Sequence, residues 1–114
     1  MLDEATKQTE MVLSHHLQNF GVNWDEFMRG YAEDAVMITP QGQLNGVAAI
    51  RTFFEALPPN LLPLIKIHRQ EFKDDYGYIY WTAEPALRMG SDAFVVRDGK
   101  IVAQLVSFYP LTFE

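Results

Sequence analysis

The stretch YAEDAVMITPQGQLNGVAAIRTFF, residues 31–54, decides the fold of this chain. It reads as the end of a helix, a short strand over residues 35–39, and a turn through Pro40 and Gly42. A break at Asn45-Gly46 then leads into another helix. The segments on either side extend this pattern, with helices before the strand and further strands after the last helix.

Two helices are predicted before residue 35. Between residues 4 and 20, side chains recur at helical spacing and form one mostly apolar stripe, made of Ala5, Thr9, Val12, Leu13, His16, Leu17 and Phe20. His16 lies inside the stripe, whereas His15 lies about 100° around the helix, nearer the solvent. Gly21 is expected to end this helix as its C′ residue.

The next helix begins with a capping-box pattern, because Asn23 is followed three residues later by Glu26. Each side chain would accept from a backbone N–H that the helix leaves free. This helix would present one apolar side, made of Trp24, Phe27, Met28 and Tyr31. A third helix places apolar residues at i, i+3, i+4 and i+7, namely Ile50, Phe53, Phe54 and Leu57, and Pro58-Pro59 prevents its continuation.

After Pro59 the hydrophobic period changes from helical to two, which indicates strands. Four strands are predicted, over residues 64–72, 78–84, 91–96 and 100–109. Three helices followed by consecutive antiparallel strands predict the α+β class, with the helices gathered on one face of a curved sheet. At 114 residues the chain is expected to be one domain, residues 1–114.

Composition and charge exclude several classes of function. A formal charge of −6 without a Lys/Arg cluster argues against nucleic acid as a partner. The apolar runs are too short for a membrane span, and the polar N-terminal segment lacks the features of a signal peptide. These features predict a cytoplasmic protein that does not bind membranes. With no cysteine, thiolate chemistry and disulfides are excluded.

No cofactor or metal site is expected. No Gly-rich phosphate loop follows a strand, and no Ser-centred elbow motif occurs. His15 and His16 are adjacent, so on a helix their side chains point apart and cannot share a metal.

The last hairpin decides which side chains face the helices. We expect Arg97-Asp98-Gly99 to form a three-residue loop that pairs Val96 with Lys100, and therefore Asp92 with Gln104. One face would then carry Asp92, Phe94, Val96, Val102, Gln104, Val106 and Phe108. A two-residue loop would instead place Asp92 opposite Leu105.

The other face of this hairpin is almost as apolar, with Ala93, Val95, Ile101, Ala103 and Leu105. A sheet with one wet face should alternate polar and apolar residues, and this sheet hardly does. We therefore predict a homodimer through the sheet. The alternative is that loops and helices of the same chain cover this face.

Three segments carry a resemblance to a known family: YAEDAV at residues 31–36, Gly46 with IRTFF at residues 50–54, and DAFVVRDGKI at residues 92–101. On these segments the chain resembles the NTF2-like superfamily, which includes ketosteroid isomerases, scytalone dehydratase and the SnoaL polyketide cyclases. The resemblance implies a cone-shaped α+β domain that encloses a pocket. These motifs are structural and imply no particular reaction.

Set beside the ketosteroid isomerases, with a one-residue gap, the chain carries His16 at the place of their oxyanion-hole tyrosine and Asp92 at that of their oxyanion-hole acid. Their catalytic base falls on Thr39, which cannot act as a base near neutral pH. The resemblance therefore disfavours steroid isomerisation by that mechanism. The catalytic sets of the SnoaL cyclases and scytalone dehydratase find no clear match, with Ser107 and Phe108 on the last strand and the histidines scattered.

Asp92 and His16 are the candidate catalytic residues. A carboxylate among aromatic and branched side chains is costly to desolvate, so Asp92 either stays neutral with a raised pKa or pairs with His16 and fixes its tautomer. The alternative is a surface aspartate. His16 could act as a general acid or base, or it could be a core histidine bonded to a carbonyl or to tyrosine.

The candidate ligand-binding residues are mostly aromatic, namely Trp24, Tyr31, Met37, Thr39, Phe54, Trp81, Phe94, Gln104 and Phe108. They could line a pocket for a small apolar molecule, although aromatic residues are more often simply core. Two functions follow as hypotheses. The first is ligand binding in the cone, with cofactor-free proton transfer of the isomerase, dehydratase or cyclase type if catalytic. The second is a homodimeric, non-catalytic interaction module whose cone is filled.

Overall fold

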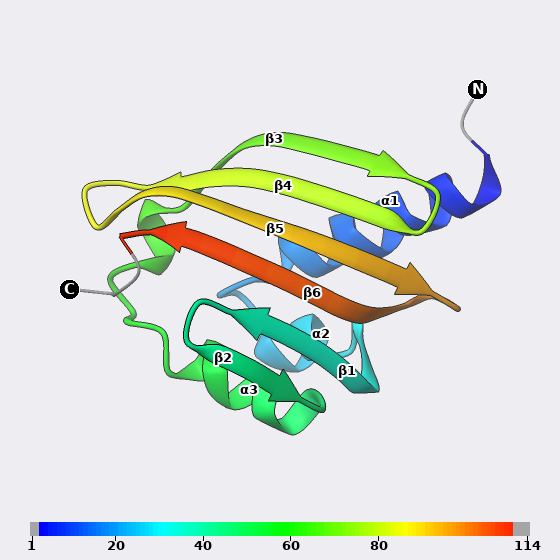
Figure 1. Cartoon of the computed structure of the whole chain (residues 1–114), viewed down its shortest axis with the longest axis horizontal. Helices are drawn as coiled ribbons and strands as arrows, with labels where there is room; N and C mark the ends of the chain where they lie inside the picture. The colour runs from blue at the N-terminus through cyan, green and yellow to red at the C-terminus, as the bar shows by residue number, and fades with distance from the viewer. Residues whose placement is uncertain (1–2, 111–114) are drawn as a thin grey trace.

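Six strands form one curved, unclosed sheet, and the helices lie on its far side in the view of Figure 1. The computed structural model describes residues 3–110, and the structural statements below concern that part of the chain. The strands are β1 (Tyr31–Thr39), β2 (Gly42–Asn45), β3 (Lys66–Lys73), β4 (Tyr76–Ala83), β5 (Leu87–Arg97) and β6 (Lys100–Tyr109). The helices are α1 (Glu4–Gln18), α2 (Trp24–Met28) and α3 (Val47–Glu55), with a 3-10 turn η1 (Leu62–Leu64).

The strand order is β2-β1-β6-β5-β4-β3. Every neighbouring pair is antiparallel except β1 and β6, which run parallel. The α+β class, the three helices on one face and the mainly antiparallel sheet are therefore confirmed. Helix α1 packs across β3, β4 and β5, and α3 packs on β1 and β2, so the helices leave an interior space above the middle of the sheet.

Helix α1 is held on the sheet by hydrogen bonds as well as by apolar contacts. Its buried residues are Thr6, Thr9, Leu13 and His16. Thr9 donates its hydroxyl to the carbonyl of Asp74 at 2.6 Å, and the backbone N–H of Asp74 donates to the hydroxyl of Thr6 at 2.8 Å. These two bonds fix α1 to the β3–β4 turn, and the helical spacing from Thr9 then carries His16 over the sheet.

The boundaries of α1 and α2 differ from the prediction. Helix α1 ends at Gln18 rather than near residue 20, with Gly21 two residues beyond the cap and at a φ of 71°. Asn23 caps α2 by accepting from the backbone N–H of Glu26 at 3.0 Å, but the Glu26 side chain lies beside Arg29 and His15. The reciprocal half of the predicted capping box is therefore not seen.

Tyr31 was expected at the end of a helix, and that prediction is wrong. Helix α2 ends at Met28, and Tyr31 begins β1 opposite Ile101 of β6. The N–H of Ile101 donates to the carbonyl of Gly30 at 2.7 Å, so pairing with a strand far along the chain overrides the local helical pattern. Residues expected only as a turn after Pro40 instead form β2, which pairs with β1.

The predicted three-residue loop of the last hairpin is also wrong. Asp98 and Gly99 both have positive φ, 52° and 76°, as the two central residues of a type I′ turn require, and Arg97 pairs with Lys100. Between the pairs Val96–Ile101 and Val95–Ala103 the register shifts, which leaves Val102 as the extra residue of a bulge. Beyond the bulge Phe94 lies opposite Gln104, and Asp92 lies opposite Val106.

This bulge restores the side-chain orientation that the predicted register required. Asp92, Phe94, Val96, Gln104, Val106 and Phe108 are buried on the helix side of the sheet, as predicted. Ile101 and Val102 exchange their expected places, because the bulge lies directly after Ile101. Ile101 is fully buried, whereas Val102 is only half-buried.

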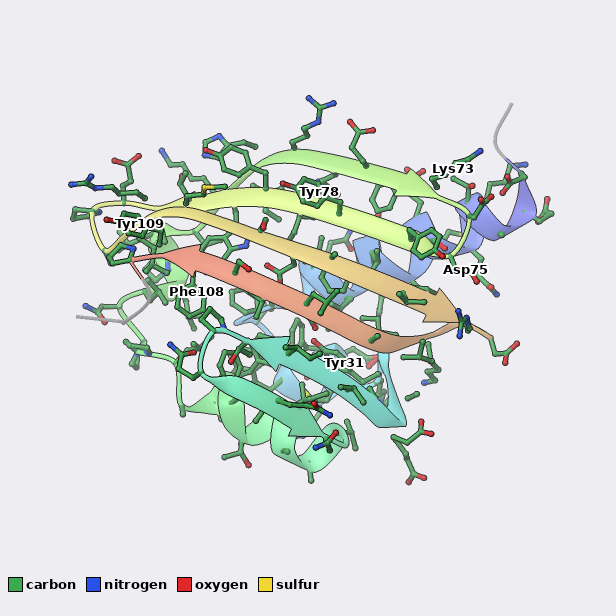
Figure 2. The ribbon with its side chains drawn as sticks, viewed as in Figure 1. Tyr31, Lys73, Asp75, Tyr78, Phe108 and Tyr109 are labelled. Atoms are coloured by element: carbon green, nitrogen blue, oxygen red, sulfur yellow. The ribbon has the colours of Figure 1, made fainter. Side chains whose placement is uncertain are left out.

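The opposite face of the sheet has no helix over it (Figure 1). Tyr76, Tyr78 and Leu105 are exposed there, at 59%, 37% and 51% of their surface, and Tyr78 is labelled on this face in Figure 2. Ala93, Val95 and Ala103 lie between them and are half-buried. Within residues 3–110, therefore, no helix of the same chain covers this face as the alternative required.

Candidate functional site

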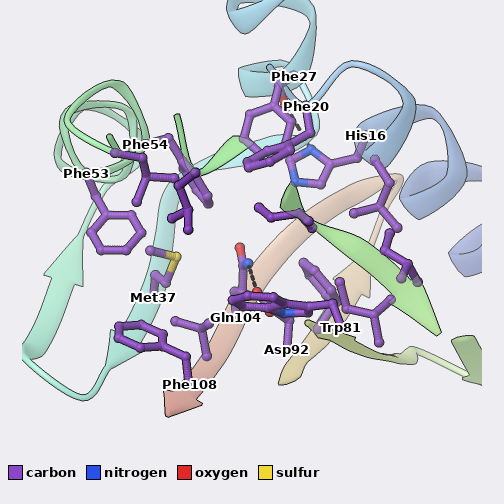
Figure 3. A pocket seen from close by; sticks show the side chains of 18 residues that line it. His16, Phe20, Phe27, Met37, Phe53, Phe54, Trp81, Asp92, Gln104 and Phe108 are labelled. Carbon is purple, nitrogen blue, oxygen red and sulfur yellow. Dashed lines mark hydrogen bonds between the residues drawn. The ribbon is translucent and has the colours of Figure 1, made fainter. Parts of the chain in front are cut away.

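A cavity of about 110 Å³ lies between the helices and the buried face of the sheet. Figure 3 shows the 18 side chains that line it, which come from α1 and the turn after it, α2, α3, the segment before β3 and the strands. Most are apolar, and three polar side chains join them, namely His16, Asp92 and Gln104. Phe53, Leu57 and Ile65 are half-buried and Ile67 is exposed, so this side of the lining reaches the molecular surface.

Asp92 is buried, with 8% of its surface exposed, and accepts two hydrogen bonds. Trp81 donates its indole N–H to Oδ1 at 2.7 Å, and Gln104 donates its amide N–H to Oδ2 at 2.6 Å. Directly opposite Asp92 lie Ile79 on β4 and Val106 on β6, so both donors are its diagonal neighbours on the flanking strands. The sheet thus holds each carboxylate oxygen from one side.

These contacts leave the pKa of Asp92 raised to about 6. Burial is the main cause, because it disfavours the charged carboxylate, and the bonds from Trp81 and Gln104 lower the pKa in part. Asp92 can therefore gain or lose a proton near neutral pH. The surface-aspartate alternative is excluded, and the pKa is raised in the expected direction, but both oxygens accept hydrogen bonds, so the neutral form that was expected with it is not shown.

Tyr31 extends this network behind Gln104. Its hydroxyl donates to Oε1 of Gln104 at 2.6 Å, which fixes the orientation of the amide so that its nitrogen faces Asp92. Burial, with a smaller contribution from the charge of Asp92, raises the pKa of the Tyr31 hydroxyl well above its ordinary value. Tyr31 is therefore a neutral donor, and the chain of bonds runs from Tyr31 through Gln104 to Asp92.

His16 lies on the opposite wall of the cavity, with 1% of its surface exposed. Its Nδ1 lies 2.9 Å from the carbonyl oxygen of Phe27, and its ring stacks on the Phe27 ring with centroids 3.8 Å apart. The Tyr31 ring meets it edge-on at 4.9 Å. Burial lowers the pKa of His16 to about 3, so the imidazole is neutral at physiological pH.

Asp92 does not hold His16 in one tautomer. The bonds of Asp92 come from Trp81 and Gln104, whereas the bond of His16 goes to the Phe27 carbonyl. The predicted pairing of the two is therefore wrong, because the peptide oxygen at the end of α2 lies nearer the ring. The alternative, a core histidine bonded to a carbonyl, describes the observed bond, and the ring also lines the cavity (Figure 3).

The structure brings most of the predicted site residues together. Eight line the cavity, namely His16, Met37, Phe54, Trp81, Asp92, Phe94, Gln104 and Phe108. Three do not line it. Trp24 packs behind the wall against Phe20, Phe27 and Phe54; Tyr31 lies behind Gln104; and Thr39 donates to the carbonyl of Gly42 in the β1–β2 turn.

Several lining residues were not among the predicted ones. Phe20 and Leu17 belong to the apolar stripe of the first predicted helix, and Phe53 and Leu57 to that of the third, so their spacing could have identified them. Val106 shares the inner face with Gln104. Leu61 and Ile65 lie around a 3-10 turn that the two-residue period does not reveal.

The matching family is described as the SnoaL-like domain, and its sequence profile matches residues 21–104. This chain belongs to the SnoaL-like family. The matched segment includes Asp92, Trp81 and Gln104, whereas His16 precedes it. No curated protein matches this SnoaL-like chain by sequence.

Solved structures agree with this membership. An NTF2-like protein of unknown function from Burkholderia xenovorans LB400 has a TM-score of 0.79 at 15% identity, over 93% of this chain and 86% of that one. A protein from Kribbella flavida DSM 17836 whose name suggests a ketosteroid isomerase has a TM-score of 0.75 at 21% identity, over 96% and 82%. An NTF2-like protein of unknown function from Mesorhizobium loti has a TM-score of 0.76 at 18% identity, over 95% and 96%. At these identities the likeness shows the NTF2-like fold alone.

Within residues 3–110, no group of three or more His, Cys, Asp and Glu side chains is arranged to hold a metal ion. None of the helices there is long and apolar enough to cross a membrane.

Proposed function

We propose that this SnoaL-like domain binds a small, mostly apolar molecule in the cavity under α1 and α3. The observation that carries the proposal is a buried carboxylate and a buried imidazole on the walls of one otherwise apolar hollow. Concave apolar sites with a few convergent polar groups are typical of small-molecule binding. Such groups are costly to bury, so their presence on a cavity wall favours a role toward a ligand over one in packing alone.

The size of the cavity restricts the ligand. A dry engineered cavity of about 150 Å³ holds benzene. The cavity here is about 110 Å³, with partly exposed lining at Phe53 and Ile67 that would let part of a ligand extend toward solvent. We expect a molecule whose buried part is about one ring in size.

The chemistry that the site supports best is proton transfer. With its pKa at about 6, Asp92 can act as an acid or a base near neutral pH without a cofactor. In its ionised form it can accept a proton from a bound ligand, and in its protonated form it can return one. This agrees in kind with isomerase, dehydratase or cyclase reactions, and the name of the Kribbella flavida neighbour suggests an isomerase. Thr39 lies outside the cavity, so nothing supports the steroid-isomerase base at that position.

Toluene titration followed by methyl NMR tests ligand binding. We expect shifts at Ile79 and Val106, which line the cavity, and none at Leu105 on the outer face. Asp92→Asn should lower the affinity for any natural ligand, or the turnover, while the fold is kept. The matched control is Asp34→Asn, an exposed acid of β1. Binding is rejected if toluene and other ring-sized probes leave the cavity methyls unchanged at saturating concentration.

A second function has one observation in its favour. The uncovered face of the sheet exposes Tyr76, Tyr78 and Leu105 around the small residues Ala93 and Ala103. A second copy of the chain could cover this surface symmetrically, which would make the protein a homodimeric interaction module. Binding in the cavity and dimerisation through the sheet use opposite faces and do not exclude each other.

A further inference from the structure

The hydrogen bond of His16 decides which ring nitrogen carries the proton. The partner of Nδ1 is the carbonyl oxygen of Phe27, which can only accept. Nδ1 must therefore carry the hydrogen and donate it. Among the residues that the structure describes, no carboxylate contacts the ring. The ring lies among Phe27, Tyr31 and Phe94, and its lowered pKa keeps it neutral. In a neutral imidazole with a protonated Nδ1, Nε2 is a bare acceptor.

Nε2 has no hydrogen-bond partner among the described residues. Within those residues, every side-chain nitrogen or oxygen that is fully buried from water has a hydrogen-bond partner. Nε2 is therefore not sealed and lies at the cavity surface, in agreement with the direction of the ring in Figure 3. On this wall His16 therefore offers a ligand a hydrogen-bond acceptor, the lone pair of Nε2, and no donor.

The packing around His16 prevents the ring from changing this arrangement. Phe27 stacks on one side of it, and Gly30 lies so close that an added Cβ would be 3.0 Å from Nδ1. The Phe27 carbonyl also accepts the N–H of Gly30 at 3.2 Å, which fixes that oxygen independently of His16. Turning the ring over would place a carbon against this oxygen and lose the bond.

On the opposite wall, Asp92 has the same polarity above its pKa. Trp81 and one amide hydrogen of Gln104 donate to the carboxylate, and Tyr31 donates to Gln104, so these three hydrogens are directed at the protein's own acceptors. An ionised Asp92 can only accept. A ligand that presents a hydroxyl or an N–H would satisfy His16, whereas a carbonyl oxygen facing Nε2 would meet a second lone pair.

We propose that the cavity is selective for neutral, ring-sized molecules that donate a hydroxyl or N–H hydrogen to Nε2 of His16, such as phenols and aromatic amines, over carbonyl compounds of the same size. This inference rests on the proposed binding function and adds the class of ligand. It assigns His16 as the residue that determines specificity. It gives the residue the opposite polarity to a tyrosine hydroxyl, which would donate.

The first test observes the tautomer in the unmodified protein. Two-bond nitrogen–proton NMR spectra of the imidazoles distinguish a protonated from an unprotonated ring nitrogen. We expect Nδ1 of His16 to be protonated and Nε2 to be unprotonated at a pH above the pKa of Asp92. Phenol should shift the Nε2 resonance strongly, because it donates to that atom, and toluene should shift it little. A protonated Nε2 overturns the inference.

The second test compares affinities for phenol, aniline, toluene and benzaldehyde in the wild type, His16→Phe and His15→Phe. The His16→Phe variant keeps an aromatic ring in the stack, and the Phe27 carbonyl retains the Gly30 bond. His15 is the neighbouring exposed histidine, so its variant is the matched control.

Loss of one hydrogen bond should weaken phenol and aniline about three- to tenfold relative to toluene in His16→Phe. Their affinities should be unchanged relative to toluene in His15→Phe. In the wild type, benzaldehyde should gain nothing over toluene. An unchanged ratio of phenol to toluene affinity in His16→Phe overturns the inference while leaving cavity binding intact. Failure of all four probes to bind the wild type rejects the proposed function itself.

Discussion

Trp81 donates its indole N–H to Oδ1 of Asp92 at 2.7 Å, from the strand that flanks Asp92 on one side. Gln104 performs the same role at Oδ2 from the strand on the other side, at 2.6 Å. A carboxylate held in this way is buried and yet retains a proton affinity suited to chemistry near neutral pH. The predictions below concern this arrangement, the imidazole facing it, and the surfaces that hold both in place.

Replacing Asp92 with Asn should change how stability depends on pH. The folded pKa of Asp92, about 6, is above its ordinary 3.8, so its contribution to stability is fully present below pH 3.8 and is lost as the pH rises through 6. The loss is about 3 kcal/mol at 1.4 kcal/mol per unit. The variant lacks this loss, so its free energy of unfolding minus that of the wild type should rise by about 3 kcal/mol between pH 3 and 8. Urea denaturation measures this, and a difference that is constant with pH would contradict the assignment.

Asp92→Asn should also reverse which groups donate in the hydrogen bonds that link Tyr31, Gln104 and residue 92. An amide at this position can accept from Trp81 but would present its NH₂ group to the NH₂ group of Gln104. Rotation of the Gln104 amide removes that conflict, and its nitrogen then donates to the Tyr31 oxygen. We expect the Tyr31 hydroxyl hydrogen to leave Gln104, which a crystal structure supported by side-chain amide NMR would detect. An unrotated amide would show that the network direction does not depend on Asp92.

His16→Phe should produce the opposite pH dependence. The folded pKa of His16, about 3, is below its ordinary 6.5, so the unfolded chain binds the proton first and wild-type stability falls as the pH decreases below 6.5. A variant without the imidazole avoids this loss. Its stability relative to the wild type should rise by about 1.4 kcal/mol per pH unit from 6.5 downwards. Between pH 4 and 6 the opposite effects of Asp92 and His16 on the free energy of unfolding nearly cancel in the wild type. The free energy of unfolding should therefore change with pH in opposite directions in the Asp92 and His16 variants. The same change with pH in both variants would refute this account.

Gly90→Ala should displace Trp81. Gly90 lies opposite Trp81 on β5, and an added Cβ would overlap the indole ring, which has to move. Overpacking of this kind costs about 1–3 kcal/mol. We also expect the Trp81 bond to Asp92 to be lost and the pKa of Asp92 to rise, because that bond lowers it. Carbonyl-labelled NMR of Asp92 measures this. Gly77→Ala is the control: its added Cβ would overlap a methyl group of Leu13 and touch Phe72, neither of which lines the cavity, so the pKa of Asp92 should not change.

Thr9→Val should loosen α1 from the sheet. The hydroxyl of this fully buried threonine donates to the Asp74 carbonyl, and valine keeps the shape while leaving that oxygen without its partner. The expected cost is about 1–3 kcal/mol in the free energy of unfolding. Thr52→Val in α3 removes only a bond to the carbonyl of Ala48 on an exposed helix face and should cost less. Equal losses of unfolding free energy in the two variants would show that the Thr9–Asp74 hydrogen bond does not contribute to stability beyond an ordinary surface bond.

Leu105→Glu should abolish self-association if the uncovered face of the sheet is a dimer interface. Leu105 is exposed beside Ala93 and Ala103, and a buried unpaired carboxylate there would be costly. Sedimentation velocity should show a wild-type dimer and a monomeric variant. The control is Met11→Glu, an apolar residue of α1 that is more exposed than Leu105 and lies outside this face. A monomeric wild type at high concentration would rule out this interface.

The amino-acid pattern by itself determined which way the key side chains point. The helical spacing from Thr9 through Leu13 places His16 on the buried side of α1, and the two-residue period places Asp92 beside Phe94 on the inner face of β5. Both periods are local properties of the backbone, so they survive errors in the predicted boundaries. The α+β class follows from the same periods, because it needs only the order of helices and strands.

Tertiary structure alone decided what those side chains touch. Tyr31 lies in a strand because β6 pairs with it, and Gln104 reaches Asp92 diagonally because a bulge at Val102 shifts the register. His16 is fixed by the Phe27 carbonyl, a backbone atom that no side-chain pattern reveals. A sequence period specifies the face on which a side chain lies, whereas a hydrogen bond requires the relative position of two segments to within a fraction of an ångström. That position depends on strand register and helix packing across the whole domain.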